Sequence, residues 1–311
     1  MKKLLLLSLF TIYFCLFIGY SQNIVPNGDF EFYTSCPNAP AQINRAYPWY
    51  DPNNATSDSS NSCAPDSSNI SVPCIFGCFC FQNAHSGNGY CGLFAYGNNY
   101  REYIQVKLSD SLKHNTCYSV TFYINLINHT LYASNNIGAY FSNLAIFCPN
   151  PTAYNLTAQI LLTGNPIISD TVNWTKINGV YNAIGGEQYL TIGNLARDSN
   201  TFHQIIDTIQ NVDNRAYYFV DDVSLYEIKT SEIAGRDTTI CHGDSVQLGI
   251  ANYEGVTYSW QPAAGLSNTT IGNPYAKPLT TSTYFLTQTT PCAVTIDTVV
   301  VTLGNCYIGG G

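Results

Sequence analysis

Acidic side chains occur in two stretches whose other residues suit β-strands. Asp29 and Glu31 flank the apolar Phe30 near the start of the chain. Much later, Asp221 and Asp222 interrupt the apolar stretch "YYFVDDVSLYEI". Acids are depleted in strands and are costly to bury without a partner. These carboxylates therefore either face solvent on edge strands or have a partner that the fold supplies.

Catalytic motifs are absent from the sequence. It contains no G-x-S-x-G elbow, no H-E-x-x-H helix motif and no Walker-type loop. A glycosidase needs only two carboxylates, which no spacing excludes, and Glu102 and Glu187 are the candidates for such a pair. We therefore expect a protein that is not an enzyme, with a polysaccharide or ester hydrolase as the alternative class.

Aromatic residues beside polar ones suggest a binding surface. Sugars offer apolar C–H faces and many hydroxyl groups, so their sites combine aromatic rings with hydrogen-bonding side chains. The candidates in or beside long connections are Trp49, Tyr50, Tyr90, Tyr96, Tyr100 and Arg101. Tyrosine is abundant here, with 24 residues, so the competing interpretation is that these side chains fill the core.

The chain begins with features of an exported protein. Lys2 and Lys3 precede a continuous apolar run and small residues, which is typical of a secretory signal peptide over residues 1–21. No later segment is long and apolar enough to span a membrane. The formal net charge is −8 and there is no basic patch with interleaved aromatics, so we expect no nucleic-acid partner. The expected location is secreted, extracellular or on the outer cell surface.

Cysteines are expected to form disulfides in that oxidising environment. Eight of them precede residue 230 and follow the leader: Cys36, Cys63, Cys74, Cys78, Cys80, Cys91, Cys117 and Cys148. Their connectivity cannot be read from the sequence. In the tail, Cys241 and Cys292 are predicted to pair, which leaves Cys306 over.

Short alternating segments predict an all-β fold. Val120, Phe122 and Ile124 alternate with polar or aromatic residues, the period of a half-buried strand. Further strands are predicted at 102–108, 137–147, 172–182, 188–194 and 217–227. We therefore expect a jelly-roll sandwich over residues 22–228, with a disulfide-stapled loop region at 50–90.

A second pattern follows the charged stretch 229–236, which is predicted to be a linker. Short strands are predicted within 237–250, 258–262, 281–288 and 294–303, and residues 307–311 form a short tail. The order of Cys241, Trp260 and Cys292 suits a small sandwich over 237–306 with a bridged core. On "TICHGDSVQL", "YSWQPAAGLS" and "TTSTYFLT", this segment resembles the Ig-like or PKD-like repeats of Bacteroidetes surface proteins. The resemblance implies a spacer or adhesive stalk.

The larger segment also resembles a known group. "VPNGDFE" and "YYFVDDVSLYE" are similar to the first and last strands of galactose-binding-like jelly rolls, which include carbohydrate-binding modules and exported surface proteins. The resemblance implies a structural calcium ion held by an acid from each strand. Glu31 and either Asp221 or Asp222 match those positions, and the carbonyl of Asn27 or Asp29 would add ligands.

These observations together predict a non-enzymatic surface protein that binds carbohydrate or a surface polymer. Adhesion is the expected role, and relatives in the same surface-protein group often carry gliding-associated domains. The alternative within binding is a structural adhesin that contacts protein.

Overall fold

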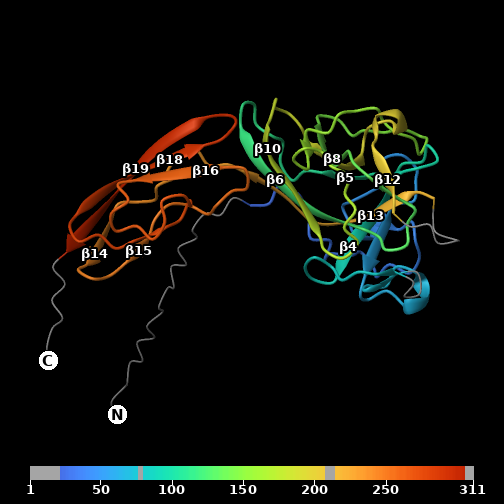
Figure 1. Ribbon diagram of the computed structural model, residues 1–311, viewed down its shortest axis with the longest axis horizontal. Helices are drawn as coiled ribbons and strands as arrows, with labels where there is room; N and C mark the ends of the chain where they lie inside the picture. Colours follow the sequence, from blue (N-terminus) through green and yellow to red (C-terminus); the bar gives the residue numbers. More distant parts are fainter. Residues whose placement is uncertain (1–21, 76–79, 207–213, 305–311) are drawn as a thin grey trace, which may run out of the picture.

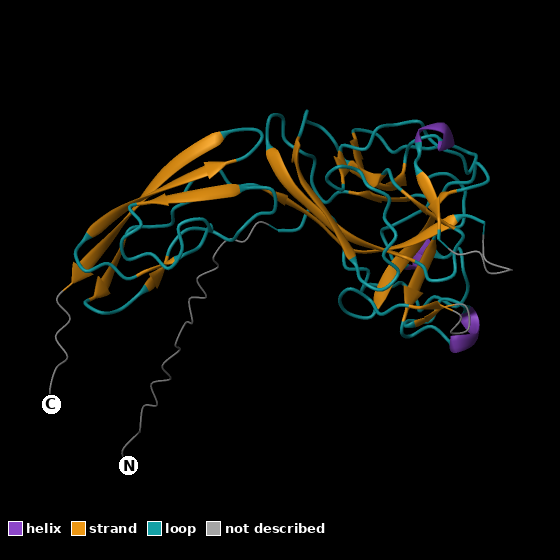
Figure 2. Cartoon of the chain, in the orientation of Figure 1, coloured by secondary structure: helices purple, strands orange, loops and turns teal. Residues whose placement is uncertain are grey.

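The computed structural model describes residues 22–75, 80–206 and 214–304. Within these ranges the chain is almost entirely strand and loop, which confirms the predicted all-β class (Figure 2). The described helices are short 3-10 turns: η1 (Ile43–Arg45), η2 (Asp66–Ser68) and η3 (Asp198–Asn200). The predicted leader 1–21, the tail 307–311, Cys78 and Cys306 lie outside the described residues.

The first lobe is a sandwich of two antiparallel sheets. The larger sheet has the strand order β1-β4-β13-β6-β10, formed by β1 (Asp58–Asn61), β4 (Gly89–Tyr96), β13 (Ala216–Glu227), β6 (Cys117–Leu126) and β10 (Thr175–Asn182). The smaller has the order β5-β11-β8-β9, formed by β5 (Ile104–Lys107), β11 (Tyr189–Asn194), β8 (Ile137–Ser142) and β9 (Ile160–Leu161). Two short pairs complete it: β7 (Tyr132–Ser134) with β12 (His203–Ile205), and β2 (Cys74–Ile75) with β3 (Cys80–Phe81).

The core of this lobe lies between the two sheets and follows the period-2 pattern. Val120, Phe122 and Ile124 of β6 are fully buried in it, as predicted. Side chains of the smaller sheet, such as Leu190 and Phe141, pack into the same cluster. The strands predicted at 102–108, 137–147, 172–182, 188–194 and 217–227 all occur, with shifted ends.

The second lobe is a smaller β structure with its own core. Its sheets are β14-β19-β18-β16 and β15-β17, formed by β14 (Thr238–Cys241), β15 (Val246–Gln247), β16 (Thr257–Gln261), β17 (Tyr275–Ala276), β18 (Ser282–Thr289) and β19 (Val294–Gly304). Trp260 is buried there, and its Nε1 donates to the carbonyl of Ile271 at 2.8 Å. Figure 1 shows the two lobes side by side along the longest axis of the molecule.

The opening segment is not the strand that its sequence suggests. Asn27 and Phe30 have positive φ angles of 49° and 51°, which break an extended conformation. The segment still lies against β13, because Val223 N donates to the Gly28 carbonyl at 2.7 Å. A Cβ at Gly28 would lie 1.9 Å from the Val223 carbonyl oxygen, so only glycine fits this contact. The first and last segments of the lobe are neighbours, but only the last one is a strand.

The stretch 50–90 also differs from its prediction. The sequence predicts a stapled loop region here, yet β1 pairs with β4 at the edge of the larger sheet. One disulfide, Cys36–Cys63, staples the segment on its N-terminal side, as the interpretation of this region as a stapled loop requires.

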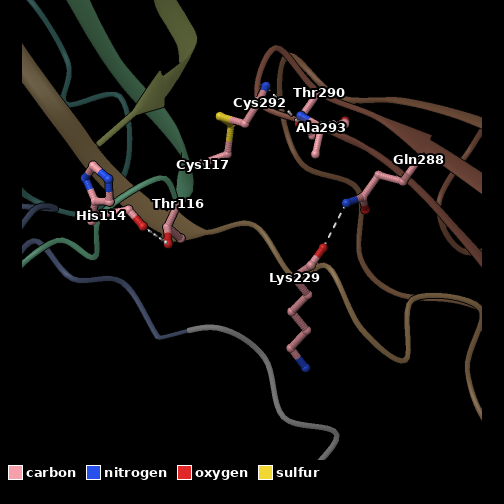
Figure 3. Close-up of a disulfide and its surroundings, with 8 residues drawn as sticks. All are labelled: His114, Thr116, Cys117, Lys229, Gln288, Thr290, Cys292 and Ala293. Carbon is pink, nitrogen blue, oxygen red and sulfur yellow. Dashed lines mark hydrogen bonds between the residues drawn. A yellow bond between two sulfur atoms is a disulfide. The ribbon is translucent and has the colours of Figure 1, made fainter. Parts of the chain in front are cut away.

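The predicted Cys241–Cys292 pairing is wrong. Cys292 is bonded to Cys117 at the start of β6, so this disulfide joins the two lobes (Figure 3). Cys241 is disulfide-bonded as well, but not to Cys292. Cys292 lies in the turn between β18 and β19, and this turn faces the first lobe, so the partner of Cys292 is a cysteine of that lobe. Cys80, Cys91 and Cys148 are free thiols.

The segment 229–236 is less exposed than a free linker. Ile233 and Ala234 are buried in the core of the second lobe. The Lys229 carbonyl accepts a hydrogen bond from Gln288 Nε2 at 2.8 Å (Figure 3). Within this segment, the run from Thr230 to Glu232 is exposed, and so is Arg236 at its end. No helix among the described residues has the length and apolar character needed to cross a membrane.

Candidate functional site

A groove lies on the face of the larger sheet that points away from the core. Its floor carries the side chains that alternate with the core residues along β6, β10 and β13. Tyr123 of β6 lies opposite Lys176 of β10 in the strand register. On the other side of β6, Tyr226 of β13 lies opposite Ser119. The floor is thus a pleated surface of tyrosine, hydroxyl and charged groups.

The walls of the groove come from three segments that are far apart in the sequence. They are the N-terminal segment, the loop after β3 and the loop between β15 and β16 of the second lobe. These segments contribute Asn23, Gly28, Asp29, His85, Asn252, Tyr253 and Glu254. The enclosed volume is about 640 Å³, which is in the range of small-molecule sites. Both lobes are needed to form it.

Contacts between the lobes hold the far wall in place. Glu254 forms an ion pair with Lys176, and its backbone carbonyl accepts a hydrogen bond from Ser119 Oγ at 3.1 Å. Exposed ion pairs contribute little to stability. The Cys117–Cys292 disulfide is therefore the strongest described link that fixes this wall against the floor.

The chemistry of the lining suits a polar ligand with apolar faces. Tyr226 and Tyr253 are half-buried rings that border the groove, and Asn252, Asp222 and Glu254 offer amide and carboxylate groups beside them. Aromatic rings contact the C–H faces of a sugar, while carboxylates and amides accept and donate hydrogen bonds to its hydroxyls.

His85 joins the near wall to the floor. Its ring stacks on Tyr123 with centroids 3.6 Å apart and an interplanar angle of 19°. Its Nδ1 lies 2.5 Å from Asp222 Oδ2, and Ser86 Oγ donates to Asp222 Oδ1 at 2.8 Å. The loop is therefore held on the sheet by both stacking and hydrogen bonds, so one face of Tyr123 is covered.

Two acids, Glu31 and Asp221, hold the loop from His85 to Gly89 at its two ends. Glu31 Oε1 accepts hydrogen bonds from the backbone N–H groups of Asn88, at 2.6 Å, and Gly89, at 2.8 Å. Asp221 Oδ2 accepts from the N–H groups of His85, at 2.8 Å, and Ser86, at 3.3 Å. Backbone amides are thus the partners of both acids in this structure.

Asp221 is the more unusual of the two acids because it is 0% exposed. Burial, followed by the neighbouring charge of Asp222, raises its pKa to about 8, against the lowering effect of its three backbone hydrogen bonds. A buried carboxyl group with a raised pKa is either protonated near neutral pH or needs a cation to balance it.

The residues present fit the calcium site that the resemblance implies only in part. Glu31 and Asp221 are oxygen ligands of the right type, and one loop links them. The Asn27 carbonyl, however, already accepts hydrogen bonds from Trp49 Nε1 and Phe30 N, and Asp29 is exposed. Among the described residues, no three His, Cys, Asp or Glu side chains gather closely enough to hold a metal ion. Glu31 and Asp221 remain the candidates for holding it.

The predicted aromatic platform is not brought together. Trp49, Tyr90 and Arg101 are fully buried, so they support the fold and offer no face to a ligand. Trp49 packs on Phe30 in the main core, and Tyr90 packs on Phe219 in a smaller cluster that includes Val72 and Cys80. These three residues follow the competing interpretation, that the tyrosines and their neighbours fill the interior.

The other three members of the predicted platform are half-buried and occupied. Tyr50 donates to Gln105 Oε1 at 2.6 Å, and Tyr100 donates to Glu102 Oε1 at 3.0 Å. Tyr96 stacks on His203 with centroids 4.4 Å apart. None of the six lines the groove.

The carboxylates proposed for a hydrolase are both fully buried. Glu102 accepts hydrogen bonds from Thr56 and from Phe94 N, and burial raises its pKa to about 7. Glu187 accepts from Tyr181 Oη at 2.6 Å and from two backbone amides. Neither carboxylate can reach a polymer on the surface in this conformation.

The groove was not predicted from the sequence. The alternation that predicts the core in 117–126 and 217–227 also predicts which side chains point outward, so it could have identified Tyr123 and Tyr226. The wall formed by Asn252, Tyr253 and Glu254 had no such signal, because it depends on how the second lobe docks.

Comparisons with known proteins identify no family. No known family and no curated protein matches the sequence. Solved structures with a related overall shape include the CBM22-1 xylan-binding domain of Xyn10C from Paenibacillus barcinonensis, with 13% identity over 68% of this chain and 97% of that one and a TM-score of 0.37. TmCBM61 in complex with β-1,4-galactotriose has 13% identity over 67% and 100%, with a TM-score of 0.30. A putative sugar-binding protein from Bacteroides thetaiotaomicron has 14% identity over 67% and 100%, with a TM-score of 0.28. At these values none of the three identifies a ligand for this chain.

Proposed function

We propose that the protein is an exported, non-enzymatic surface protein that binds carbohydrate in the groove between its two lobes. The observation that carries this proposal is the groove of about 640 Å³, whose tyrosine rings lie among amide, hydroxyl and carboxylate groups. Glu102 and Glu187 are buried and so out of reach of a polymer on the surface, which makes the hydrolase alternative less favoured. The disulfides agree with an oxidising, extracellular location.

The second lobe then has two roles in this proposal. As an Ig-like or PKD-like spacer it holds the binding lobe away from the cell, which suits adhesion. Through Asn252, Tyr253 and Glu254 it also completes the binding groove. A structural adhesin that contacts protein is the alternative, and it would use the same exposed face without specificity for sugars.

Glycan binding is expected to depend on the tyrosines of the groove. Tyr226→Ala removes an aromatic face from the floor, and we expect about tenfold weaker binding, or about 1.4 kcal/mol. The measurement is a glycan array on the whole mature chain, followed by calorimetry with the sugars that bind. Tyr275→Ala, at an exposed tyrosine of the second lobe outside the groove, is the matched control.

Two outcomes would contradict this proposal. One is a protein that binds no glycan on the array but captures a protein partner through the same face, which would support the alternative adhesin. The other is release of reducing sugar or acid from a polysaccharide panel, abolished by Glu102→Gln or Glu187→Gln, which would support a hydrolase.

A structural calcium ion is part of the proposal. Binding to Glu31 and Asp221 would tie the N-terminal segment to β13 through oxygen ligands and would balance the buried charge of Asp221. A ligand at a hundredfold excess over its Kd stabilises the folded state by about 2.7 kcal/mol. We therefore expect the melting temperature to rise with calcium and to fall with a chelator, while magnesium substitutes poorly.

Glu31→Gln is expected to remove most of that response, because it deletes a charged ligand at nearly constant shape. Asp110→Asn, at an exposed acid of the same lobe, is the control and should respond to calcium like the natural chain. The whole chain is used because an isolated first lobe would leave Cys117 without its partner. A melting curve indifferent to both calcium and chelator, in protein shown to be metal-free, would leave amide binding as the only role of Glu31.

A further inference from the structure

Two large aromatic side chains are exposed beside the groove. Phe32 is 59% exposed and Tyr47 is 60% exposed, although residues of this size are usually more buried. Together with Pro26 and Pro48 they line a shallow depression with a volume of about 620 Å³. Neighbouring exposed apolar side chains of this kind mark an interaction site more often than isolated ones do.

The backbone beneath the two rings is held by one side chain. Asn27 Nδ2 donates to the carbonyls of Phe32, at 2.9 Å, and Tyr47, at 3.0 Å. Asn27 Oδ1 accepts from Phe32 N at 2.9 Å. Trp49 Nε1 in turn donates to the Asn27 carbonyl at 2.9 Å, which anchors Asn27 to the core. The two rings therefore stand on a fixed base, and a ligand would not have to order it on binding.

The depression adjoins the groove. Asn27 and Asp29 line both of them, so Phe32 and Tyr47 lie next to the part of the groove bordered by Asp29. Carboxylates border the depression at Asp29 and Glu31, and the net charge of the chain is −8. This charge favours a neutral chain over a polyanion.

We propose that Phe32 and Tyr47 form a second subsite, on which a neutral polysaccharide bound in the groove lays further sugar units. This inference rests on the proposed carbohydrate-binding function and adds to it a preference for long chains. Short oligosaccharides fill only the groove, whereas long ones also stack on the two rings and gain affinity from them.

The test compares short and long ligands on four proteins: the natural chain, Phe32→Ala, Tyr47→Ala and Tyr226→Ala. The probes are xylan, β-1,4-galactan and short and long oligosaccharides cut from each, with binding measured by affinity electrophoresis and calorimetry. We expect Phe32→Ala and Tyr47→Ala to weaken binding of the polymers about tenfold and to leave binding of the short oligosaccharides unchanged. Tyr226→Ala should weaken both. Melting temperatures serve as the folding control, because exposed rings contribute little to the core.

The failures of the two proposals are distinguishable. If the natural chain binds the probes and the Phe32 and Tyr47 variants bind polymer equally well, the second subsite is wrong and the groove stands. If the natural chain binds none of the probes and no sugar on the array, the carbohydrate-binding function itself fails. If Phe32→Ala instead abolishes a concentration-dependent dimer, the rings contact a second copy of the chain, and the subsite is likewise overturned.

Discussion

Proteolytic cleavage between the two lobes is expected to leave both halves attached to each other until the protein is reduced. The exposed residues in this region are Thr230 to Glu232 and Arg236, and exposed loops are the preferred sites of nicking. Cys117 lies before this site and Cys292 lies after it, so their disulfide spans the cut. We expect one band on a non-reducing gel and two on a reducing gel.

Cys117→Ser and Cys292→Ser provide the matched controls. Either variant should separate into two fragments after cleavage even without reductant, whereas Cys80→Ser, at a free thiol, should behave like the natural chain. Two fragments from the natural chain on a non-reducing gel would show that the lobes are not cross-linked at this position. Cutting within the sheets while the 229–236 segment stays intact would show that the predicted boundary is wrong.

Loss of this disulfide should also affect stability and binding. The disulfide joins residues separated by 175 positions, and closing a loop of that length restrains the unfolded chain by about 5 kcal/mol in the chain-entropy description. Without it, the described links across the groove are the Lys176–Glu254 ion pair and the Ser119 hydrogen bond. We therefore expect the Cys117→Ser variant to melt earlier and to bind glycans more weakly, because the far wall is no longer fixed.

Stability is expected to fall as the pH rises from about 4 to about 8, with Asp221 making the largest contribution. Burial raises its folded-state pKa from 3.8 to about 8, so the folded state keeps a proton that the unfolded state has already lost. The stabilisation is therefore complete below the unfolded pKa and is lost as the pH approaches the folded pKa. Asp58, with a pKa raised to about 6, and Glu102, raised to about 7, act in the same direction over narrower windows.

Asp221→Asn separates this contribution from the others. Each pKa unit corresponds to about 1.4 kcal/mol, so the natural chain should lose several kcal/mol across the window. The Asn variant should show a flatter decline, with the difference in slope spread between the ordinary pKa of 3.8 and the folded-state pKa of about 8. Its absolute stability at low pH should be lower, because an amide group cannot accept all the hydrogen bonds of the carboxyl. The slope is therefore the quantity to compare.

Chemical denaturation at several pH values measures this slope, with Asp244→Asn as an exposed control in the second lobe. An equal slope in the natural chain and the Asp221→Asn variant would mean that Asp221 ionises normally in the folded protein. Saturating calcium should flatten the decline in the natural chain if the ion binds Asp221, because a cation favours the ionised carboxylate.

The sequence by itself determined which residues lie inside each strand. In β6, and in β13 after Asp222, apolar residues recur every second position, and this period places Val120, Phe122 and Leu225 in the core. It also separates two structural units, because the apolar pattern restarts after residue 236 around Trp260. Such signals are local, and strand geometry converts them directly into burial.

Only the tertiary structure decided which segments meet. The pairing of Cys117 with Cys292 depends on the turn after β18 facing β6, and no spacing in the sequence encodes that approach. The same docking places Tyr253 and Glu254 over the sheet and so creates the groove. The tertiary structure also decided the partners of the acids, because Glu31 and Asp221 accept hydrogen bonds from backbone amides of the loop from His85 to Gly89. Segments far away in the chain bury Trp49, Tyr90 and Arg101. Hydrogen bonds and packing between distant segments depend on the whole fold, so composition and periodicity could mark these residues as unusual but could not say what each one contacts.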